Sequence, residues 1–373
     1  MKKEVLLIGL VNLNRDGGDV NHFKLLVKYL GDVFKVTVCA IGDNRAVHLS
    51  FKFPNYRLYR VAYWNWIILY KCLRYCLNHR VSAIYFRESG LIISPYILSL
   101  ILRKPLFVEV NGVLLDDTPI PKLLTKTLFR LLYLVPKRIF ASCGYRQLIS
   151  RDFKANINKL VTVHLGYHFD SEREYMDRIC DVQEGMTIAF IGNLHPYQGL
   201  FGFILGFNRF LINSGREDIV LKIFGDGVDK PRLISLVNEL NINKHVQFVG
   251  FIDQVKLNAF LKSVQLCVSP FAFDRGDEFT ISALKTYDYF NAQCAILTSK
   301  MDENAPFIKE HGLGDYFEMG TEEEIESKLY WLLSADGQNM IRECYSKKYG
   351  WLADRLSWKN RFDIITGELL KEI

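Results

Sequence analysis

The order of apolar and polar positions along the chain predicts an alternation of short buried strands and helices. In the first half, short continuous apolar runs predict strands, and the first helix is expected at residues 20–30. The expected strands are 5–10, 36–40, 83–86, 106–110, 138–141 and 160–164. Continuous apolar strands separated by helical segments indicate a parallel sheet that is covered on both faces.

The alternation stops at a polar stretch, residues 169–185, and restarts after it. Strands are expected at 186–191, 219–224, 246–248, 266–269 and 295–298, helices at 200–213, 230–240, 256–263 and 283–291, and mostly helix from 322 to 373. We therefore predict an α/β protein with two Rossmann-like, doubly wound parallel-sheet domains facing a cleft. The domains are residues 1–168 and, with the linker, 169–350, and residues 351–373 form a helix that packs back toward the first domain. Ligands of such sheets bind outside the carboxyl ends of the strands.

Composition agrees with a soluble two-domain chain in a reducing compartment. The chain has 373 residues, of which 49% are hydrophobic and 24% charged, as is usual for globular domains. Its eight cysteines include no CxxC pair, so neither a zinc site nor a disulfide framework is indicated. No apolar run reaches the ~18 residues that span a bilayer. We expect a cytoplasmic protein whose contact with a membrane, if any, is peripheral.

Positive charge is concentrated in one segment. The formal net charge is +6, yet residues 121–160 alone carry nine Lys or Arg against one acid, Asp152. Within this segment Lys122, Lys126 and Arg130 recur every four residues among leucines, which predicts an amphipathic cationic helix suited to an anionic bilayer. The alternative is a domain helix with one solvated face. A nucleic-acid partner is not expected, because no basic motif interleaved with aromatic residues is present.

Glycines follow several strands of the second half. Gly192 follows one strand, Gly199 opens a helix, and Gly225 and Gly227 follow the next strand. Glycine lets backbone N–H groups approach a phosphate closely, and the N-terminus of a helix adds a favourable dipole. One glycine after a strand is usually a turn, but this series predicts a site for a diphosphate.

In this order and spacing, residues 186–299 resemble the donor-binding half of the retaining GT-B glycosyltransferases (glycosyl transferases group 1, family 4-like), the type that builds bacterial polysaccharides. The resemblance is looser in the first half, where Gly17 and Gly18 before a helix and the segment 107–112 fit. It implies transfer of a sugar from a UDP- or GDP-sugar, with retention, to a glycan or lipid-linked acceptor. The nucleotide would bind the second domain and the acceptor the first, and no cofactor would be needed. A metal is not expected, because no Asp-x-Asp stands in a suitable loop.

The resemblance implies a donor site and shows where this chain departs from the family. The donor residues are Gly17, Gly18, Gly192, Asn193, Gln198, Gly199, Gly225, Gly227, Phe251, Pro270, Glu278, Thr280, Ile281, Ser282 and Asp288. Asp288 is expected to bind a ribose, and Glu278 to substitute for the acid that Thr280 replaces. Asn193 stands where the family usually has an Arg or an Asn, and Gln198 stands where it has a Lys, so the cations expected there are absent.

These departures define the candidate catalytic residues. We hypothesise that Arg275 or Lys285 supplies the positive charge missing at Asn193 and Gln198, because a departing diphosphate needs cations and N–H dipoles. Asn111 stands where many members have a histidine.

Two other functions are compatible with parts of the pattern. A catalytically degenerate glycosyltransferase-like binding or regulatory subunit would explain the missing cations. A nicotinamide-dependent enzyme would also use doubly wound sheets. It is disfavoured because no G-x-G-x-x-G opens a helix after the first strand, and no acid follows about twenty residues later.

Overall fold

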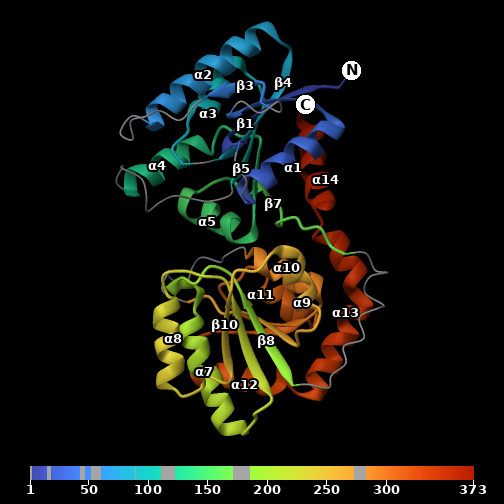
Figure 1. Cartoon of the computed structure of the whole chain (residues 1–373). Coiled ribbons are helices and arrows are strands. Elements are labelled where there is room, and N and C mark those ends of the chain that lie inside the picture. Colours follow the sequence, from blue (N-terminus) through green and yellow to red (C-terminus); the bar gives the residue numbers. More distant parts are fainter. Residues whose placement is uncertain are drawn as a thin grey trace. The chain divides into compact units, whose positions relative to one another are not determined.

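The computed structural model describes residues 2–14, 18–42, 47–51, 60–88, 90–110, 122–170, 185–272 and 283–373. The chain divides into two compact units (Figure 1). Unit 1 comprises residues 1–166 together with 358–373, and unit 2 comprises residues 167–357. The sequence pattern led us to expect these boundaries after residues 168 and 350.

The described part of unit 1 contains a seven-stranded sheet of order β3-β2-β1-β4-β5-β6-β7, in which every pair is parallel. Its strands are β1 Glu4–Asn12, β2 Lys35–Ile41, β3 Leu49–Phe51, β4 Val81–Glu88, β5 Leu106–Val110, β6 Arg138–Ala141 and β7 Leu160–Thr162. Its helices are α1 Gly18–Val33, α2 Arg60–Asn78, α3 Ser94–Leu102, α4 Lys122–Leu132, α5 Cys143–Phe153, the short 3₁₀ helix η1 Ile157–Lys159 and α14 Trp358–Glu372.

Both faces of this sheet are buried, as the continuous apolar strands predicted. In β1, Leu6 and Ile8 pack into the layer formed by α2, α3, α4 and α5. Val5 and Leu7 of the same strand pack into the opposite layer, formed by α1 and α14. Figure 1 shows the two layers on either side of the strands. Side chains alternate between the two faces of a strand, so the single apolar run of β1 contributes to the cores on both sides of the sheet.

The described part of unit 2 contains a six-stranded parallel sheet of order β10-β9-β8-β11-β12-β13. Its strands are β8 Met186–Ile191, β9 Ile219–Phe224, β10 Val246–Gly250, β11 Leu266–Ser269, β12 Ala295–Ser299 and β13 Gly314–Phe317. Its helices are the 3₁₀ helix η2 Pro196–Gln198, α7 Leu200–Ser214, α8 Lys230–Glu239, α9 Gln254–Leu261, α10 Leu284–Ala292, α11 Ala305–Glu310, α12 Glu322–Leu332 and α13 Ala335–Arg355.

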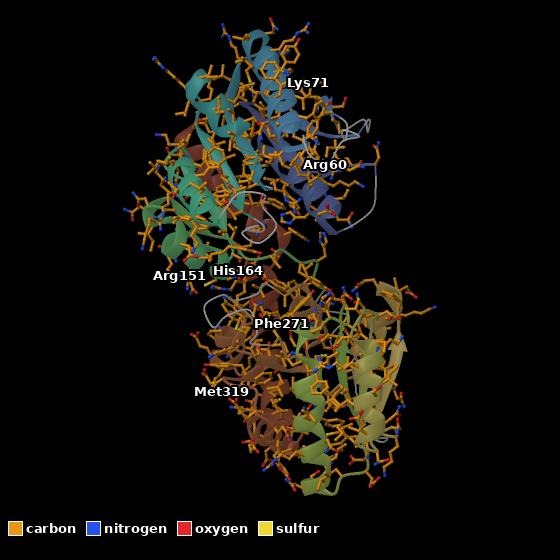
Figure 2. The ribbon with its side chains drawn as sticks, turned by 90° about the vertical axis from the view of Figure 1, so that its left-hand side faces the viewer. Arg60, Lys71, Arg151, His164, Phe271 and Met319 are labelled. Atoms are coloured by element: carbon orange, nitrogen blue, oxygen red, sulfur yellow. The ribbon has the colours of Figure 1, made fainter. Side chains whose placement is uncertain are left out.

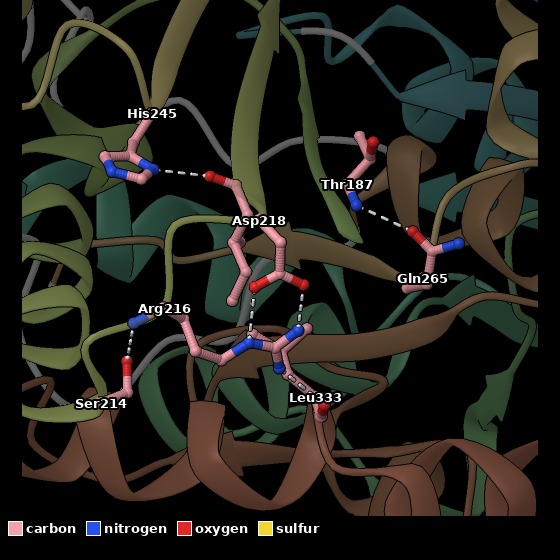
Figure 3. Close-up of polar contacts among 8 residues, drawn as sticks. Thr187, Ser214, Arg216, Asp218, His245, Gln265 and Leu333 are labelled. Carbon is pink, nitrogen blue, oxygen red and sulfur yellow. Dashed lines mark hydrogen bonds and ion pairs between the residues drawn. The ribbon is translucent and has the colours of Figure 1, made fainter. Parts of the chain in front are cut away.

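The amino-terminal edge of this second sheet is closed by polar contacts among protein groups (Figure 3). Arg216 forms two hydrogen bonds with the carboxylate of Asp218, at 2.9 and 2.5 Å, and a third at 3.3 Å with the carbonyl of Leu333. The backbone N–H of Thr187, in β8, donates to the side-chain oxygen of Gln265 at 2.8 Å. Since this edge satisfies its own polar groups, the opposite, carboxyl edge is where a ligand is expected.

Candidate active site

Three loops meet at the carboxyl edge of the unit 2 sheet: residues 192–199 after β8, 225–229 after β9, and 270–272 after β11. Backbone hydrogen bonds join them, from Leu194 N to Asp226 O at 2.9 Å and from Ala272 N to Tyr197 O at 3.0 Å. A Cβ at Gly227 would lie 2.2 Å from the carbonyl oxygen of Leu194. The loops therefore form one packed cluster.

Two more glycines are required by this packing. A Cβ at Gly225, where φ is +123°, would lie 2.0 Å from the carbonyl oxygen of Gly192. A Cβ at Gly199, where φ is +73°, would lie 2.0 Å from the carbonyl oxygen of Pro270. Both values are far below any real contact, so a side chain would separate the loops. The sequence pattern attributed these glycines to a phosphate, and the structure shows a further reason, which is the close approach of one loop to another.

Gly192 lies next to the side chain of a buried lysine, Lys285. Its φ is +145°, and a Cβ there would lie 3.4 Å from Nζ of Lys285, in the first turn of α10. Lys285 Nζ donates to Oε1 of Gln198 at 2.5 Å. It also lies 4.1 and 4.8 Å from the ring centres of Phe190 and Phe271 (Phe271 is labelled in Figure 2). Burial lowers the pKa of Lys285 to about 7.

Asp288 lies one turn further along α10 and is partly buried. Its Oδ1 accepts hydrogen bonds from the hydroxyl of Tyr167 at 2.6 Å and from Nε2 of Gln254 at 3.1 Å. Burial raises the pKa of Asp288, and these two hydrogen bonds oppose that rise. Tyr167 was not among the predicted site residues, and its hydrogen bond joins residues 121 apart in the sequence.

The remaining described candidates lie at three places. Asn193 is exposed in the loop after β8, and Phe251, directly after β10, has 85% of its side chain exposed. Gly18 begins α1 and belongs to unit 1. The structure thus brings together Gly192, Asn193, Gln198, Gly199, Gly225, Gly227, Pro270 and Lys285 in the loop cluster of unit 2.

Other candidates lie outside the described residues and stay predictions: Gly17, Asn111, Arg275, Glu278, Thr280, Ile281 and Ser282. Among the residues that the structure does describe, no group of three or more His, Cys, Asp or Glu side chains is arranged to hold a metal ion.

Unit 1 contains a buried charged cluster that the sequence analysis missed. Glu109, fully buried in β5, accepts from the hydroxyl of Tyr85 at 2.7 Å and from Nη2 of Arg361, in α14, at 2.8 Å. Nε2 of His22 lies 3.0 Å from the same carboxylate. Burial by itself raises the pKa of Glu109, but Arg361 and His22 hold it well below its usual value. A glutamate inside an apolar strand was a signal for a buried ion pair.

The predicted basic helix exists as α4, but two of its three cations contact a neighbouring helix. Nζ of Lys126 lies 3.1 Å from the carboxylate of Asp152 in α5, and Nε of Arg130 donates to the carbonyl of Asp152 at 3.2 Å. Lys122 begins the helix, and its side chain is outside the described set. In the described chain, every helix is too short or too polar to cross a bilayer.

Most of unit 2 matches a known protein family. Residues 174–349 match the family Glycosyl transferases group 1, so unit 2 carries a domain of this family. No curated protein matches the chain.

Solved structures match over nearly the whole length. A glycosyltransferase from Rickettsia africae has 14% identity and a TM-score of 0.75, covering 100% of this chain and 98% of its own. Anabaena HepE in complex with UDP has 13% identity and a TM-score of 0.70, with 99% and 100% covered. The lipopolysaccharide outer core galactosyltransferase WaaB in its apo form has 12% identity and a TM-score of 0.72, with both chains covered completely. At these identities the likeness shows the fold, which is GT-B, and confirms two parallel-sheet α/β domains.

Proposed function

We propose that this chain, whose unit 2 is a glycosyltransferase group 1 domain, transfers a sugar from a UDP- or GDP-sugar to a glycan or lipid-linked acceptor with retention at the anomeric carbon. One observation carries the proposal: the unit that matches the family also gathers Gly192, Gln198 and Lys285 at the carboxyl edge of its sheet. HepE has been solved with UDP and with UDP-glucose, so a UDP-sugar is the first donor to test.

The described side chains suggest a division of roles. Negative charge develops on the departing diphosphate, and N–H groups of the loop at Gly192 together with a nearby cation would stabilise it. Asp288, held by Tyr167 and Gln254, would accept hydrogen bonds from the ribose. The exposed ring of Phe251 would contact the base. The diphosphate itself would act as the base on the front face of the sugar, without a metal. We assign the donor to unit 2 and the acceptor to unit 1, which contains Asn111.

The test is release of the nucleoside diphosphate from a panel of UDP- and GDP-sugars in the presence of lipid-linked glycan acceptors. We expect one donor to be turned over, and the anomeric configuration of the product to match that of the donor by NMR. A chain that binds none of the nucleotides in calorimetry and releases none would contradict the proposal.

One observation favours an alternative, a degenerate binding or regulatory subunit. Asn193 and Gln198 provide no charge at positions where the family usually has an Arg or an Asn and a Lys, respectively. Such a subunit would bind the nucleotide in the same calorimetric titration but release no diphosphate with any donor and acceptor of the panel. The two assays together therefore separate the enzyme from the binding protein.

We further propose that the protein acts in cell-surface polysaccharide synthesis and contacts the cytoplasmic face of an anionic membrane through the outer surface of α2, α3 and α4. These helices cover the same face of the unit 1 sheet (Figure 1). They carry three Lys or Arg in α2, none in α3 and three in α4, and no acid at all. Arg60 and Lys71 of α2 are labelled in Figure 2.

The same surface exposes large apolar side chains: Trp66, Tyr70 and Leu77 of α2, Leu100 and Ile101 of α3, and Leu123, Leu124 and Leu131 of α4. Exposed fractions of 69% for Trp66 and 72% for Leu123 are high for such residues. Tryptophan, leucine and basic residues without acids are the composition of surfaces that lie on anionic bilayers. The proposal of membrane contact therefore does not depend on the three cations of α4 alone, two of which contact Asp152.

Co-sedimentation with vesicles of phosphatidylcholine, with and without phosphatidylglycerol, tests this contact. We expect binding only to the anionic vesicles and loss of binding at high salt. The double variant Arg103→Glu/Lys104→Glu, at the end of α3, should bind more weakly, and Lys256→Glu in unit 2 should not. Equal binding by both variants would contradict the assignment.

A further inference from the structure

Lys285 occupies an unusual position for a lysine. It is the second residue of α10, only 9% of its surface is exposed, and its Nζ is enclosed by the rings of Phe190 and Phe271 and by Oε1 of Gln198. Lysine is almost never buried to this extent without an acid beside it. The contacts with the rings and the amide recover part of the lost hydration, but neither carries a full negative charge.

The described residues provide no carboxylate within ion-pair distance of Nζ. Asp302, which follows β12, is the acid whose charge acts on Lys285 and raises its pKa. However, Asp302 is itself engaged: its carboxylate accepts from the hydroxyl of Thr286 at 2.6 Å and from the backbone N–H of Asn304 at 2.9 Å. The burial of Lys285 outweighs the effect of Asp302, and the net shift of the lysine pKa is downward.

The other charged groups of the loop cluster do not supply the missing partner. Asp226, after β9, pairs with Lys230 at 2.9 Å. Asp288, on α10 itself, accepts from Tyr167 and Gln254. His195, in the loop after β8, packs its ring against that of Tyr197, with 5.0 Å between the centres. Lys285 is thus a buried amine whose counter-charge does not come from the described protein groups.

Nζ of Lys285 lies beside the backbone of the glycine loop that follows β8. Gly192 places its backbone next to the amine without a side chain between them, since even a Cβ there would lie 3.4 Å from Nζ. The same loop contains Gln198, at the position where the resemblance led us to expect a lysine. The structure therefore supplies an amine from α10 at the position where a cation is missing from the loop.

We infer that Lys285 is the cation that binds the diphosphate of the donor, with Gln198 as its positioning residue, and that the site takes up a proton from solvent when the diphosphate binds. This inference rests on the proposed function. It has a simple physical basis, because a diphosphate supplies a counter-charge that the described protein groups do not give the buried amine, and so favours the ammonium form. The proton is added to Nζ, and no covalent bond of the ligand changes.

The experiment is isothermal calorimetry of the full chain with UDP and GDP, with uridine and guanosine as controls that lack the diphosphate. We expect the diphosphate that binds to take up about one proton at pH 8, revealed by heats that differ between buffers of different ionisation enthalpy. Its affinity should fall about fivefold between pH 7 and pH 8, because a smaller fraction of the amine is then charged.

Three variants separate the role of the charge from that of the fold. Lys285→Met should lose affinity for the diphosphate by about tenfold or more and keep its affinity for the nucleoside. Lys285→Arg, whose charge is permanent, should bind without proton uptake. Lys309→Met, an exposed lysine of α11, should behave as the unmodified protein. Thermal unfolding of Lys285→Met without ligand should show no loss of stability, because an uncompensated buried charge has been removed.

The possible outcomes are distinct. If the protein binds UDP or GDP but Lys285→Met binds it equally well, or if no proton is taken up at pH 8, the inference is wrong while the proposed function stands. If Lys285→Met does not fold, Lys285→Gln replaces it in the same comparison. If the unmodified protein binds no nucleoside diphosphate at any pH, the proposed function fails and the inference fails with it.

Discussion

Arg361 and Glu109 are 252 residues apart in the sequence, and Nη2 of the arginine donates to the carboxylate at 2.8 Å. The glutamate is fully buried in the central part of the unit 1 sheet, and the arginine belongs to the last helix of the chain. Phe362, Ile365 and Leu369 of that helix pack into the same core. The final helix is therefore an internal part of unit 1, fixed by both apolar and ionic contacts.

Removing one partner of this pair should destabilise unit 1. Arg361→Met leaves the carboxylate of Glu109 buried without its main cation, and we expect a loss of about 3–5 kcal/mol in the free energy of unfolding. The double variant Glu109→Gln/Arg361→Met should recover part of the loss, because the uncompensated charge is gone. Urea denaturation followed by circular dichroism measures both, with the exposed Lys359→Met of the same helix as control. Equal stability of Arg361→Met and the control would refute this account.

Glu88 predicts a dependence of stability on pH. It is 5% exposed at the end of β4, where it accepts from the hydroxyls of Tyr96 at 2.5 Å and Tyr133 at 2.8 Å. Burial raises its pKa to about 7, and the two tyrosines oppose the rise. The folded state thus holds a proton that the unfolded state has lost above about pH 4.5. The protonated carboxyl of Glu88 therefore makes its full contribution to stability below about pH 4.5 and loses it as the pH rises toward 7.

Replacing this carboxyl with an amide should remove that dependence. Glu88→Gln keeps the shape without the charge, so we expect it to be more stable than the unmodified protein at pH 8, by about 1–3 kcal/mol, and no more stable at pH 5. The difference between the two proteins in urea midpoint across this pH range is the measurement. A difference that does not change with pH would show that Glu88 titrates normally.

The packing of the loop cluster predicts opposite effects for two glycines. Gly225→Ala places a Cβ 2.0 Å from the carbonyl oxygen of Gly192, at a φ of +123°. It should destabilise unit 2 by about 2 kcal/mol or more and abolish binding of UDP. Gly202→Ala, inside α7 with no atom within 4 Å of the added Cβ, should instead stabilise the protein by about 0.5–1 kcal/mol. Thermal unfolding compares the pair, and a neutral Gly225→Ala would disprove the tight junction.

Replacing Asp288 should weaken the binding of UDP without destabilising the folded protein. Asp288→Asn removes the charged acceptor assigned to the ribose, and affinity for UDP should fall about tenfold. Tyr167→Phe, which releases the carboxylate from one of its two hydrogen bonds, should weaken binding by a smaller factor. Calorimetry measures both, with the exposed Asp363→Asn in unit 1 as control. Unchanged affinity of Asp288→Asn for UDP would show that Asp288 does not bind the ribose.

The apolar runs were sufficient to predict most of both sheets. The expected strands 106–110, 138–141, 219–224 and 266–269 have the same ends as β5, β6, β9 and β11. These strands are mostly buried on both faces, so nearly every position is apolar and the pattern is unambiguous. The strands β3 and β13 were not predicted. Each forms an edge of its sheet and is only partly buried, and a polar or glycine residue interrupts its short sequence, so neither contains the continuous apolar run that marked the other strands.

The site was only partly predictable, because its chemistry depends on long-range contacts. The glycines after β8 and β9 were evident from their places in the sequence. The hydrogen bond of Lys285 with Gln198 joins residues 87 apart, and sequence reasoning left Lys285 and Arg275 as equal candidates. The cluster around Glu109 depends on a helix from the other end of the chain. Such pairs follow from the order of strands and helices in space, which hydrophobic patterning does not specify.

The return of the last helix to unit 1 has a consequence for synthesis. Unit 2 is one continuous segment, and a ribosome completes it before residue 358 is made. Unit 1 remains incomplete until Arg361 emerges, so until then Glu109 has no arginine partner from α14. The unit whose synthesis begins first is therefore the second to have all of its residues available, and a nascent chain stalled before residue 358 would carry an amino-terminal unit without α14.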